Sequence, residues 1–272
     1  MECGEFYVVA TPIGNLKDIT LRALEVLKSV DFIACEDTRV TRKLLDKYEI
    51  KSNLFDYQKF NEKECSKKIL DILNSGKSVA LVSDAGTPGI SDPGRVLFDV
   101  LRNNDVKINI LPGACAVSAF LSGVSRENEY FAFAGFLPKG EKPQTEIFQK
   151  YKDTNFIFYE SPNRLLATLK NIIDKRGESV KVAVGRELTK IFEEIKIGTA
   201  KEVFDYYSSN VLKGEIVAMV FADCALDVSE VELTEKIKKL KEEKYSDKDI
   251  SKILSCLLGE NKNKIYKLSL NL

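Results

Sequence analysis

The chain has 272 residues, in which 41 lysines and arginines balance 41 aspartates and glutamates, and it contains no histidine. Balanced charge provides no overall field for attracting nucleic acid, so such binding would need local basic patches. The lack of histidine excludes Ser-His-Asp and Cys-His nucleophilic sites and HExxH zinc sites. A general base must therefore be a carboxylate, a lysine, a tyrosine or water.

The six cysteines are scattered and form no CxxC pair, which predicts reduced structural thiols and no metal site. No apolar run approaches the ~20 residues that a membrane-spanning helix needs. Residues 1–5 lack the basic character of a signal peptide and lead directly into an apolar segment. We therefore expect a cytoplasmic protein without membrane attachment.

In the first half, short apolar segments alternate with amphipathic ones. The strand-like segments are 6–10, 32–35, 79–82 and 108–111, and the helical ones are 21–27, 41–48, 69–73, 95–101 and 114–121. This βαβ rhythm predicts an α/β domain over residues 1–125, with a mainly parallel sheet covered on both faces.

The second half changes character. Strand-like segments are 130–134, 155–159, 181–184 and 215–221, and helical ones are 162–175 and 201–207. They predict a mixed α+β second domain over 126–224 that faces the first across a cleft. From 225 to 272 the apolar residues recur at helical spacing only. This pattern predicts a small helical C-terminal domain whose lysines form a solvated charged face.

Residues 83–94 are the most informative segment. The stretch SDAGTPGISDPG holds three glycines and two prolines, and it directly follows the apolar strand 79–82. Two further turns, residues 11–16 and 112–119, also follow predicted strands. Since parallel strands end at one edge of the sheet, the three turns should converge on a pocket suited to a nucleoside. A dinucleotide site is disfavoured because GxGxxG is missing, and GxxxxGK[ST] is missing too.

Charged clusters follow other predicted strands. Asp37 or Thr38 should cap the next helix, whose basic residues at helical spacing suggest either phosphate contacts or a solvated face. Those basic residues are Arg39, Arg42, Lys43 and Lys47. Residues 160–164 and 185–190 each place an arginine near the cleft, or are capped helix starts or local ion pairs.

Several motifs occur in order along nearly the whole chain. They are VATPIGNL (9–16), DIT (18–20), CEDTR (35–39), SDAGTPGISDPG (83–94), LPG (111–113), ESP (160–162), GRE (185–187) and GE (214–215). The set resembles the ribosomal RNA small subunit methyltransferase I family, the 16S rRNA cytidine 2′-O-ribose methyltransferases of the tetrapyrrole methylase superfamily. The tail also resembles the helical domain that ends many members.

The resemblance implies a class III methyltransferase fold, a homodimer, and S-adenosylmethionine bound between two α/β domains. Carried over by motif, the cofactor site of the first domain comprises Thr11, Pro12, Asp84, Ala85, Gly86, Thr87, Pro88, Gly89, Ile90 and Ser91, with Val117, Ser118 and Ala119 beside them. Tyr159, Arg186 and Glu187 are expected to approach from the second domain.

This chain departs from the family pattern at some positions. Residues 57–62 read YQKFNE where a histidine-rich segment is expected, and Asn163 replaces a common histidine. Ala114 and Cys115 stand in place of Pro-Ser, and residues 139–143 are less basic than expected. RNA affinity is therefore expected to be lower, with the overall function kept.

The expected reaction is an in-line methyl transfer to a ribose 2′-hydroxyl of 16S rRNA in the small ribosomal subunit, where a carboxylate or water takes the proton. We expect Glu36 or Asp37 to act as base or orienter, with Asp84 as second choice. Asp37→Asn should then cut turnover sharply and leave cofactor binding intact. The expected RNA contacts are Arg39, Arg42, Lys43, Arg164, Arg186 and Lys190.

Two alternatives stay open at this point. One is a methylase of a tetrapyrrole precursor, although such enzymes typically read Gly-Gly-Asp-Pro where residues 85–88 read AGTP. The other is a noncatalytic RNA-binding module or ribosome-assembly factor. Such a module would not need nucleoside-type loops, so titration with S-adenosylmethionine separates it from an enzyme.

Overall fold

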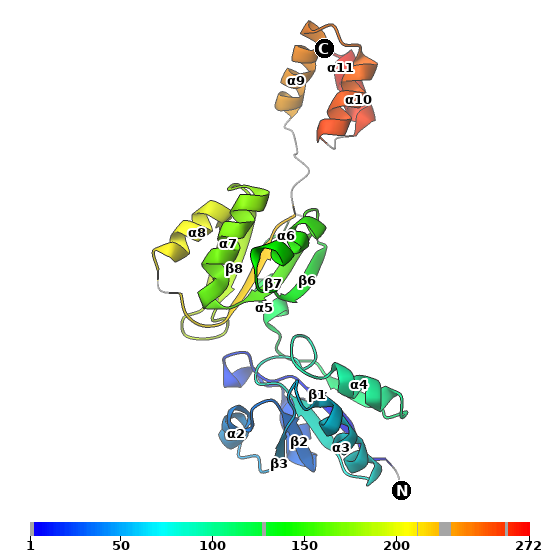
Figure 1. Ribbon diagram of the computed structural model, residues 1–272, viewed down its shortest axis with the longest axis vertical. Helices are drawn as coiled ribbons and strands as arrows, with labels where there is room; N and C mark the ends of the chain where they lie inside the picture. The colour runs from blue at the N-terminus through cyan, green and yellow to red at the C-terminus, as the bar shows by residue number, and fades with distance from the viewer. Residues whose placement is uncertain (1–2, 127–128, 211, 223–229, 259–260) are drawn as a thin grey trace.

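The computed structural model describes residues 3–126, 129–210, 212–222, 230–258 and 261–272. Within these residues, two five-stranded sheets and a C-terminal group of three helices follow one another along the long axis of the molecule (Figure 1). The predicted boundary at 224–225 lies outside the described residues, as does Cys224.

The first sheet is parallel throughout. Its strands are β1 (Phe6–Val9), β2 (Phe32–Cys35), β3 (Asn53–Asp56), β4 (Val79–Val82) and β5 (Ile108–Leu111), in the spatial order β3-β2-β4-β1-β5. Every residue of β4 is buried, as expected for the apolar centre of a parallel sheet. The predicted parallel sheet is confirmed. The edge strand β3, which lacks a continuous apolar run, was not predicted.

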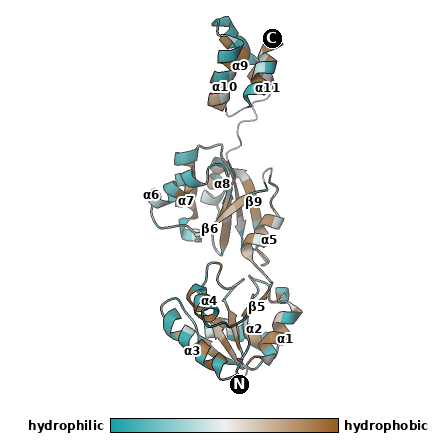
Figure 2. Cartoon of the chain, turned by 90° about the vertical axis from the view of Figure 1, so that its right-hand side faces the viewer, coloured by the Kyte–Doolittle hydropathy of each residue, from teal (hydrophilic) through white to brown (hydrophobic). Residues whose placement is uncertain are grey.

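Helices cover both faces of this sheet. On one face, α1 (Leu21–Ser29) and α2 (Thr38–Lys47) share an apolar core with strand residues such as Ile33 and Ala80. On the other face, α3 (Glu62–Asn74) and α4 (Arg95–Arg102) pack with Phe6 and Leu81. The two pairs lie on opposite sides of the strands in Figure 2. A short 3₁₀ turn, η1 (Leu16–Asp18), follows β1.

The second sheet is mixed, and together with its helices it confirms the predicted mixed α+β architecture. Its strands are β6 (Phe131–Phe136), β7 (Asn155–Glu160), β8 (Lys181–Arg186), β9 (Glu194–Thr199) and β10 (Ile216–Val220), in the order β6-β7-β10-β8-β9. Only the β6–β7 pair is parallel among these described strands. The partly exposed edge strand β9 was not predicted.

Different helices cover the two faces of the second sheet. One face carries α6 (Glu141–Lys150), α7 (Pro162–Arg176) and α8 (Ala200–Ser208). The other face receives α5 (Ala116–Ser122), whose Phe120 is fully buried there. Because α5 directly follows β5 of the first sheet, its N-terminus lies where the two sheets meet.

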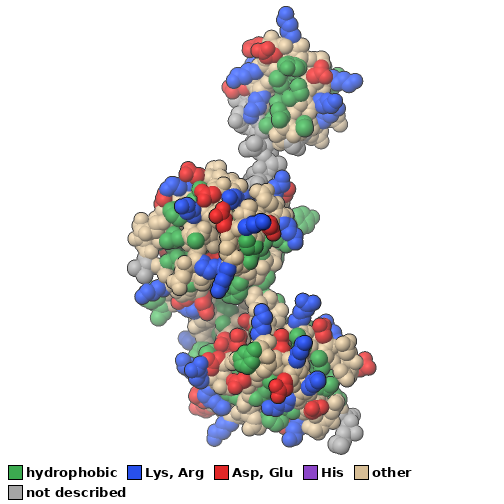
Figure 3. Space-filling model, viewed as in Figure 1, with side chains coloured by type: hydrophobic (Ala, Val, Ile, Leu, Met, Phe, Trp, Pro, Cys, Tyr) green, Lys and Arg blue, Asp and Glu red, His purple; other side chains and the backbone are tan. Residues whose placement is uncertain are grey.

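The C-terminal unit consists of α9 (Glu230–Glu242), α10 (Asp247–Leu258) and α11 (Lys262–Leu270). Figure 3 shows lysines and arginines scattered over all three parts of the visible face, with acidic side chains among them. Among the described helices, none is both long enough and apolar enough to cross a membrane.

Candidate active site

A cavity of about 400 Å³ lies between the carboxyl edge of the first sheet and the second sheet. Its lining from the first half of the chain consists of Ile13, Asp84, Ala85, Gly86, Thr87, Ile90, Ser91, Asp92, Cys115 and Ala116. From the second half come Phe136, Tyr159, Glu160, Ser161, Pro162, Leu188, Gly214, Glu215, Ile216 and Val217. The volume is that of a small-molecule site.

The loop after β4 is fastened to the end of the neighbouring strand β1. The Thr11 N–H donates to the Gly86 carbonyl at 2.8 Å, and the Gly86 N–H donates back at 3.0 Å. Thr11 Oγ1 also donates to the Ser83 carbonyl at 2.9 Å. Gly86 has a φ of +85°, which is strained for any residue with a side chain. These bonds therefore fix the backbone conformation of the loop beside the cavity.

The turn after β5 joins the same rim. Thr87 Oγ1 donates to the Ala114 carbonyl at 3.0 Å. A side chain at Gly113 would approach Ala10 Cβ to 2.7 Å, so the β5 turn lies directly against the end of β1. The three turns predicted to converge therefore meet at one rim, and this prediction is confirmed.

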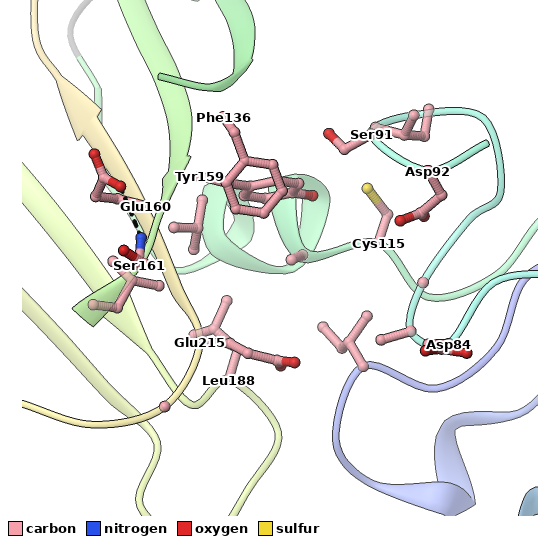
Figure 4. Close-up of a pocket in the computed structure, with 18 of the residues that line it drawn as sticks. Asp84, Ser91, Asp92, Cys115, Phe136, Tyr159, Glu160, Ser161, Leu188 and Glu215 are labelled. Carbon is pink, nitrogen blue, oxygen red and sulfur yellow. Dashed lines mark hydrogen bonds between the residues drawn. The ribbon is translucent and has the colours of Figure 1, made fainter. Parts of the chain in front are cut away.

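The second sheet supplies an aromatic and apolar wall. The Phe136 and Tyr159 rings lie edge to face with centroids 5.4 Å apart, and in Figure 4 both stand across the cavity from Ser91 and Asp92. Glu160 is 2% exposed, and its carboxylate accepts from the Ser161 N–H and from Thr168 Oγ1, both at 2.8 Å. The Glu160 carboxylate therefore already has hydrogen-bond partners within the protein.

Three carboxyl groups at the first-sheet side have raised pKa values. Burial raises the pKa of Asp92, and the charge of Asp84 adds to the effect. Burial also raises the pKa of Asp84, although its Oδ1 accepts the Asp37 N–H at 3.0 Å. Burial and the charges of Asp84 and Asp92 raise the pKa of Glu36. Acids that repel one another in this way are poised to accept a proton or to face a cation.

Asp37 is held differently, as the N-cap of α2. Its Oδ1 accepts the Arg39 backbone N–H at 2.8 Å, and its Oδ2 pairs with the Arg39 guanidinium at 2.6 Å. Hydrogen bonds from the Arg39 side chain and backbone lower the pKa of Asp37 to about 2. A carboxylate stabilised in its ionised form is a poor proton acceptor at neutral pH. The geometry therefore favours the capping role.

One loop from each sheet meets beside the cavity. At Gly14, after β1, a Cβ would lie 2.5 Å from Lys190 Cγ and 2.8 Å from Thr189 Oγ1, so any other residue would displace these side chains. Lys190 Nζ in turn pairs with Glu187 at 2.7 Å and with Glu215 at 2.9 Å. The hydrogen bond from Lys190 lowers the pKa of Glu187. Lys190, expected at RNA phosphates, therefore already has two acidic partners.

The other predicted RNA contacts fall into two groups. Arg42 and Lys43 are exposed on α2, next to Arg39, whose side chain is 86% exposed. By contrast, Arg164 Nη2 donates to the carbonyls of residues 137 and 138, and its Nε lies 3.2 Å from Glu160. Arg186 Nε lies 3.6 Å from a Glu194 oxygen. Of the predicted RNA contacts, only the three on α2 lie together at exposed positions.

The predicted cofactor residues are partly brought together. Those that line the cavity are Asp84, Ala85, Gly86, Thr87, Ile90, Ser91 and Tyr159. Thr11 does not line the cavity and instead holds the loop through its hydrogen bonds to Gly86 and Ser83. The cavity lining does not include Pro12, Pro88, Gly89, Val117, Ser118, Ala119, Arg186 and Glu187.

Several residues that line the cavity were not predicted from the sequence. Asp92 belongs to the singled-out loop 83–94, so its acidity and position were a usable signal. Phe136 follows Gly135, which has a φ of +66°, at a predicted strand end. Leu188 carried no signal, because its place at the cavity depends on how the β8–β9 loop folds.

The sequence matches known families along most of its length. The model of the Tetrapyrrole (Corrin/Porphyrin) Methylases matches residues 5–203. A Mesorhizobium japonicum protein named ribosomal RNA small subunit methyltransferase I is 45% identical over 79% of this chain and 74% of its own. Proteins of that name from Synechocystis and Thermotoga maritima are 36% and 40% identical, over 99% and 80% of this chain and 98% of each relative.

Solved structures share the fold. A cobalt precorrin-4 methyltransferase of cobalamin biosynthesis superposes with a TM-score of 0.61 at 19% identity, over 80% of this chain and 94% of its own. A uroporphyrin-III C-methyltransferase from Thermus thermophilus, complexed with S-adenosylhomocysteine, gives 0.58 at 16% identity, over 79% and 97%. At these identities the likeness concerns the fold alone.

Proposed function

The chain belongs to the tetrapyrrole methylases and, among them, to the ribosomal RNA small subunit methyltransferase I family, and from that premise we propose its reaction. It transfers the methyl group of S-adenosylmethionine to the ribose 2′-hydroxyl of a cytidine in 16S rRNA. The relatives' shared name supports an RNA substrate. The name does not specify the methylated atom, and we propose that it is the 2′-oxygen of a cytidine. A homodimer and a cytoplasmic location stay predictions.

One observation carries the proposal. Three strand-end turns enclose a cavity of about 400 Å³ that holds two half-buried carboxyl groups, Asp84 and Asp92, opposite an aromatic and apolar wall. Burial, which disfavours the charged form, is the main cause of the raised pKa of both aspartates, and a cation bound beside them would offset it. A ligand with a flat apolar part and a cationic centre fits both features.

S-adenosylmethionine has those two features, and when bound it supplies an electrophilic methyl group on a sulfonium. Ile13, Ile90 and Leu188 offer apolar contacts suited to a purine. Asp84 and Asp92 offer negative charge suited to the cationic end. The small residues 85–87 let a ligand approach the backbone closely.

We assign the proton acceptor to Asp84 in preference to Asp37. The Asp37 N–H donates to Asp84 Oδ1 at 3.0 Å, which fixes the orientation of the carboxylate. Burial raises the pKa of Asp84, whereas Arg39 holds the pKa of Asp37 at about 2. A positioned carboxylate with a raised pKa accepts a proton from a hydroxyl more readily than an ion-paired one.

The RNA is proposed to approach along α2, which is joined to β2 by Glu36 and Asp37 alone. Arg42 and Lys43 are exposed there, next to Arg39. Exposed cations of this kind contact phosphates and position an RNA without reading its bases.

The experiment maps alkali-resistant linkages in 16S rRNA before and after incubation of unmodified small subunits with the protein and S-adenosylmethionine. A 2′-O-methyl group removes the internal nucleophile of alkaline cleavage, so one new resistant linkage 3′ to a cytidine is expected. Methyl incorporation without any resistant linkage would place the methyl on a base and overturn the ribose assignment. Absence of incorporation, with S-adenosylmethionine bound, would overturn the rRNA substrate.

A further inference from the structure

An irregularity in the edge strand β6 places a phenylalanine at the cavity. Phe133 of β6 lies opposite Ile157 of β7. The next paired residue of β6 is Phe136, which lies opposite Tyr159. Three steps along β6 thus match two steps along β7, so β6 contains a β-bulge. Gly135, within the bulge, has a φ of +66°, a conformation that glycine adopts without strain.

The bulge moves the Phe136 side chain to the other face of the second sheet. In a regular strand, side chains alternate between faces, so Phe136 would share a face with Ala132 and Ala134. Those two alanines pack against the core that lies under α6, α7 and α8. Instead, the rings of Phe136 and Phe133 both lie edge to face with Tyr159, with centroids 5.4 and 5.0 Å from its own. The bulge therefore directs Phe136 toward the cavity, as β-bulges beside active sites commonly do.

Phe136 lies at the mouth of the cavity. It lines the cavity and is 60% exposed, whereas three apolar residues that also line it, Ile13, Leu188 and Val217, are each at most 9% exposed. In Figure 4 the Phe136 ring stands across the cavity from Ser91. The buried apolar residues can enclose the nucleoside of a cofactor. A ring as exposed as Phe136 is left for a group that enters from solvent.

We propose that Phe136 stacks on the base of the target nucleotide and so holds its ribose at the bound methyl donor. The inference rests on the proposed function and deepens it, because it names the part of the RNA that this side of the cavity binds. An in-line transfer needs the ribose 2′-oxygen within about 3.5 Å of the methyl carbon, so the attached base lies at the cavity mouth. A nucleotide drawn out of an RNA loses its stacking neighbours, and an aromatic ring replaces them.

The adenine of the cofactor is the competing occupant of the Phe136 ring. An added Cβ at Gly86 would lie 3.3 Å from Ile13, so this buried apolar contact for a purine lies directly beside the loop after β4. Phe136 extends from the opposite side of the cavity, on the edge strand of the second sheet. A base stacked there would not compete with an adenine at Ile13. Since every base has a flat face, Phe136 would position the nucleotide without selecting cytosine.

The test compares three variants of the full chain on unmodified small subunits with S-adenosylmethionine. Phe136→Leu keeps an apolar side chain and removes the aromatic face, whereas Phe136→Tyr keeps that face. Phe131→Leu is the matched control, because Phe131 is another exposed phenylalanine of β6, at 47%, and does not line the cavity. KM and kcat for the subunits are measured at saturating S-adenosylmethionine, and titration calorimetry gives the Kd for S-adenosylmethionine. Circular dichroism and thermal melting establish that the variants are folded.

Phe136→Leu is expected to lower kcat/KM for the subunits by about 10–100-fold, the usual loss when a base loses its stacked ring. Its Kd for S-adenosylmethionine should stay within about twofold of the unaltered chain. Phe136→Tyr should recover kcat/KM to within about threefold, and Phe131→Leu should stay within about twofold. An unchanged kcat/KM in Phe136→Leu would overturn the proposal. An equal loss in Phe136→Tyr would also overturn it, because the contact would then not depend on an aromatic face.

A second measurement addresses the adenine directly. The chain has no tryptophan, so Phe136→Trp introduces a single fluorophore at the cavity mouth, and Phe131→Trp is its control. We expect S-adenosylhomocysteine alone to change the emission of both variants equally little. Quenching of Phe136→Trp and not of Phe131→Trp would show that the adenine stacks on this ring, and it would overturn the proposal.

Failure of the proposed function gives a different result. If the unaltered chain does not methylate 16S rRNA, the proposed function fails, and this inference fails with it. If the unaltered chain methylates a base and Phe136→Leu lowers that rate, the ribose assignment fails and the stacking site stands. Ribose methylation at equal rates by the unaltered chain and by Phe136→Leu would do the reverse.

Discussion

Asp37 and Asp84 follow the neighbouring strands β2 and β4, yet their surroundings shift their pKa values in opposite directions. Asp37 caps a helix and pairs with Arg39, which lowers its pKa to about 2. Asp84 is half-buried at the cavity, and this burial raises its pKa. One hydrogen bond, from the Asp37 N–H to Asp84, couples the two residues.

Asp84→Asn should reduce the single-turnover rate of methyl transfer by about 10²–10³-fold, because the amide cannot accept the hydroxyl proton. Asp37→Asn should stay within about fivefold of the unaltered chain, since asparagine caps a helix as well as aspartate and the lost pair is exposed. Rates at saturating S-adenosylmethionine decide between them. A slower Asp37→Asn variant would return the base role to Asp37.

Asp92 carries a testable pH dependence of stability. Its pKa in the fold lies above the ordinary value of 3.8, so the ionised form is disfavoured relative to the unfolded chain. The contribution of Asp92 to the free energy of unfolding should therefore fall as the pH rises from 3.8 through its raised pKa. Asp92→Asn should raise Tm by about 1–3 °C at pH 7 without ligand, and the difference should shrink toward zero in acid. Scanning calorimetry that shows a lower Tm at pH 7 would contradict this.

The loop after β4 depends on a glycine for its backbone conformation. Gly86 has a φ of +85°, and an added Cβ would lie 3.3 Å from Ile13 at the cavity. Gly177, the C-cap of α7, has a φ of +94° and open space around it. Both glycines thus have a positive φ, but only Gly86 lies at the cavity.

Both Gly86→Ala and Gly177→Ala should cost about 1–2 kcal/mol of stability, because alanine disfavours positive φ. Only Gly86→Ala should weaken S-adenosylmethionine binding, by about tenfold or more, because it disturbs the hydrogen-bonded bridge to Thr11 and the lining. Titration calorimetry on both variants provides the comparison. Equal affinities would remove the loop from the binding site.

The α2 helix allows a parallel test of RNA contact near the cavity. Arg42→Glu/Lys43→Glu should raise the KM for the RNA about tenfold and leave kcat within about twofold, because phosphate contacts position the substrate. Lys67→Glu, on an exposed position of α3, is the control. Steady-state kinetics at two salt concentrations measure the effect. A fall in kcat at unchanged KM would contradict a purely positioning role.

The elements that could be predicted are those with a clear local pattern of apolar residues or of glycine and proline. The strands β1 and β4 are continuous apolar runs, and the glycines and prolines of residues 83–94 indicate a ligand-binding loop. The edge strands β3 and β9 were missed because partial exposure mixes polar and apolar residues in them.

At the scale of the whole molecule, the cavity exists because the second sheet closes over the rim of the first. The Gly14 backbone packs against residues 188–190, and α5 carries the chain from one sheet to the other. The contributions of Phe136 and Leu188 depend on this long-range packing, which no local pattern encodes. The acid cluster likewise arises from strand ends that are about 50 residues apart in the chain and adjacent in the sheet.

A crystal structure of the protein with S-adenosylhomocysteine would test most directly whether the cavity between the sheets is the cofactor site. We expect the nucleoside inside the cavity between the sheets, in contact with the loop 84–91, and the sulfur facing the Asp84 and Asp92 side. A ligand bound anywhere else on the chain, with this cavity filled only by water, would contradict it.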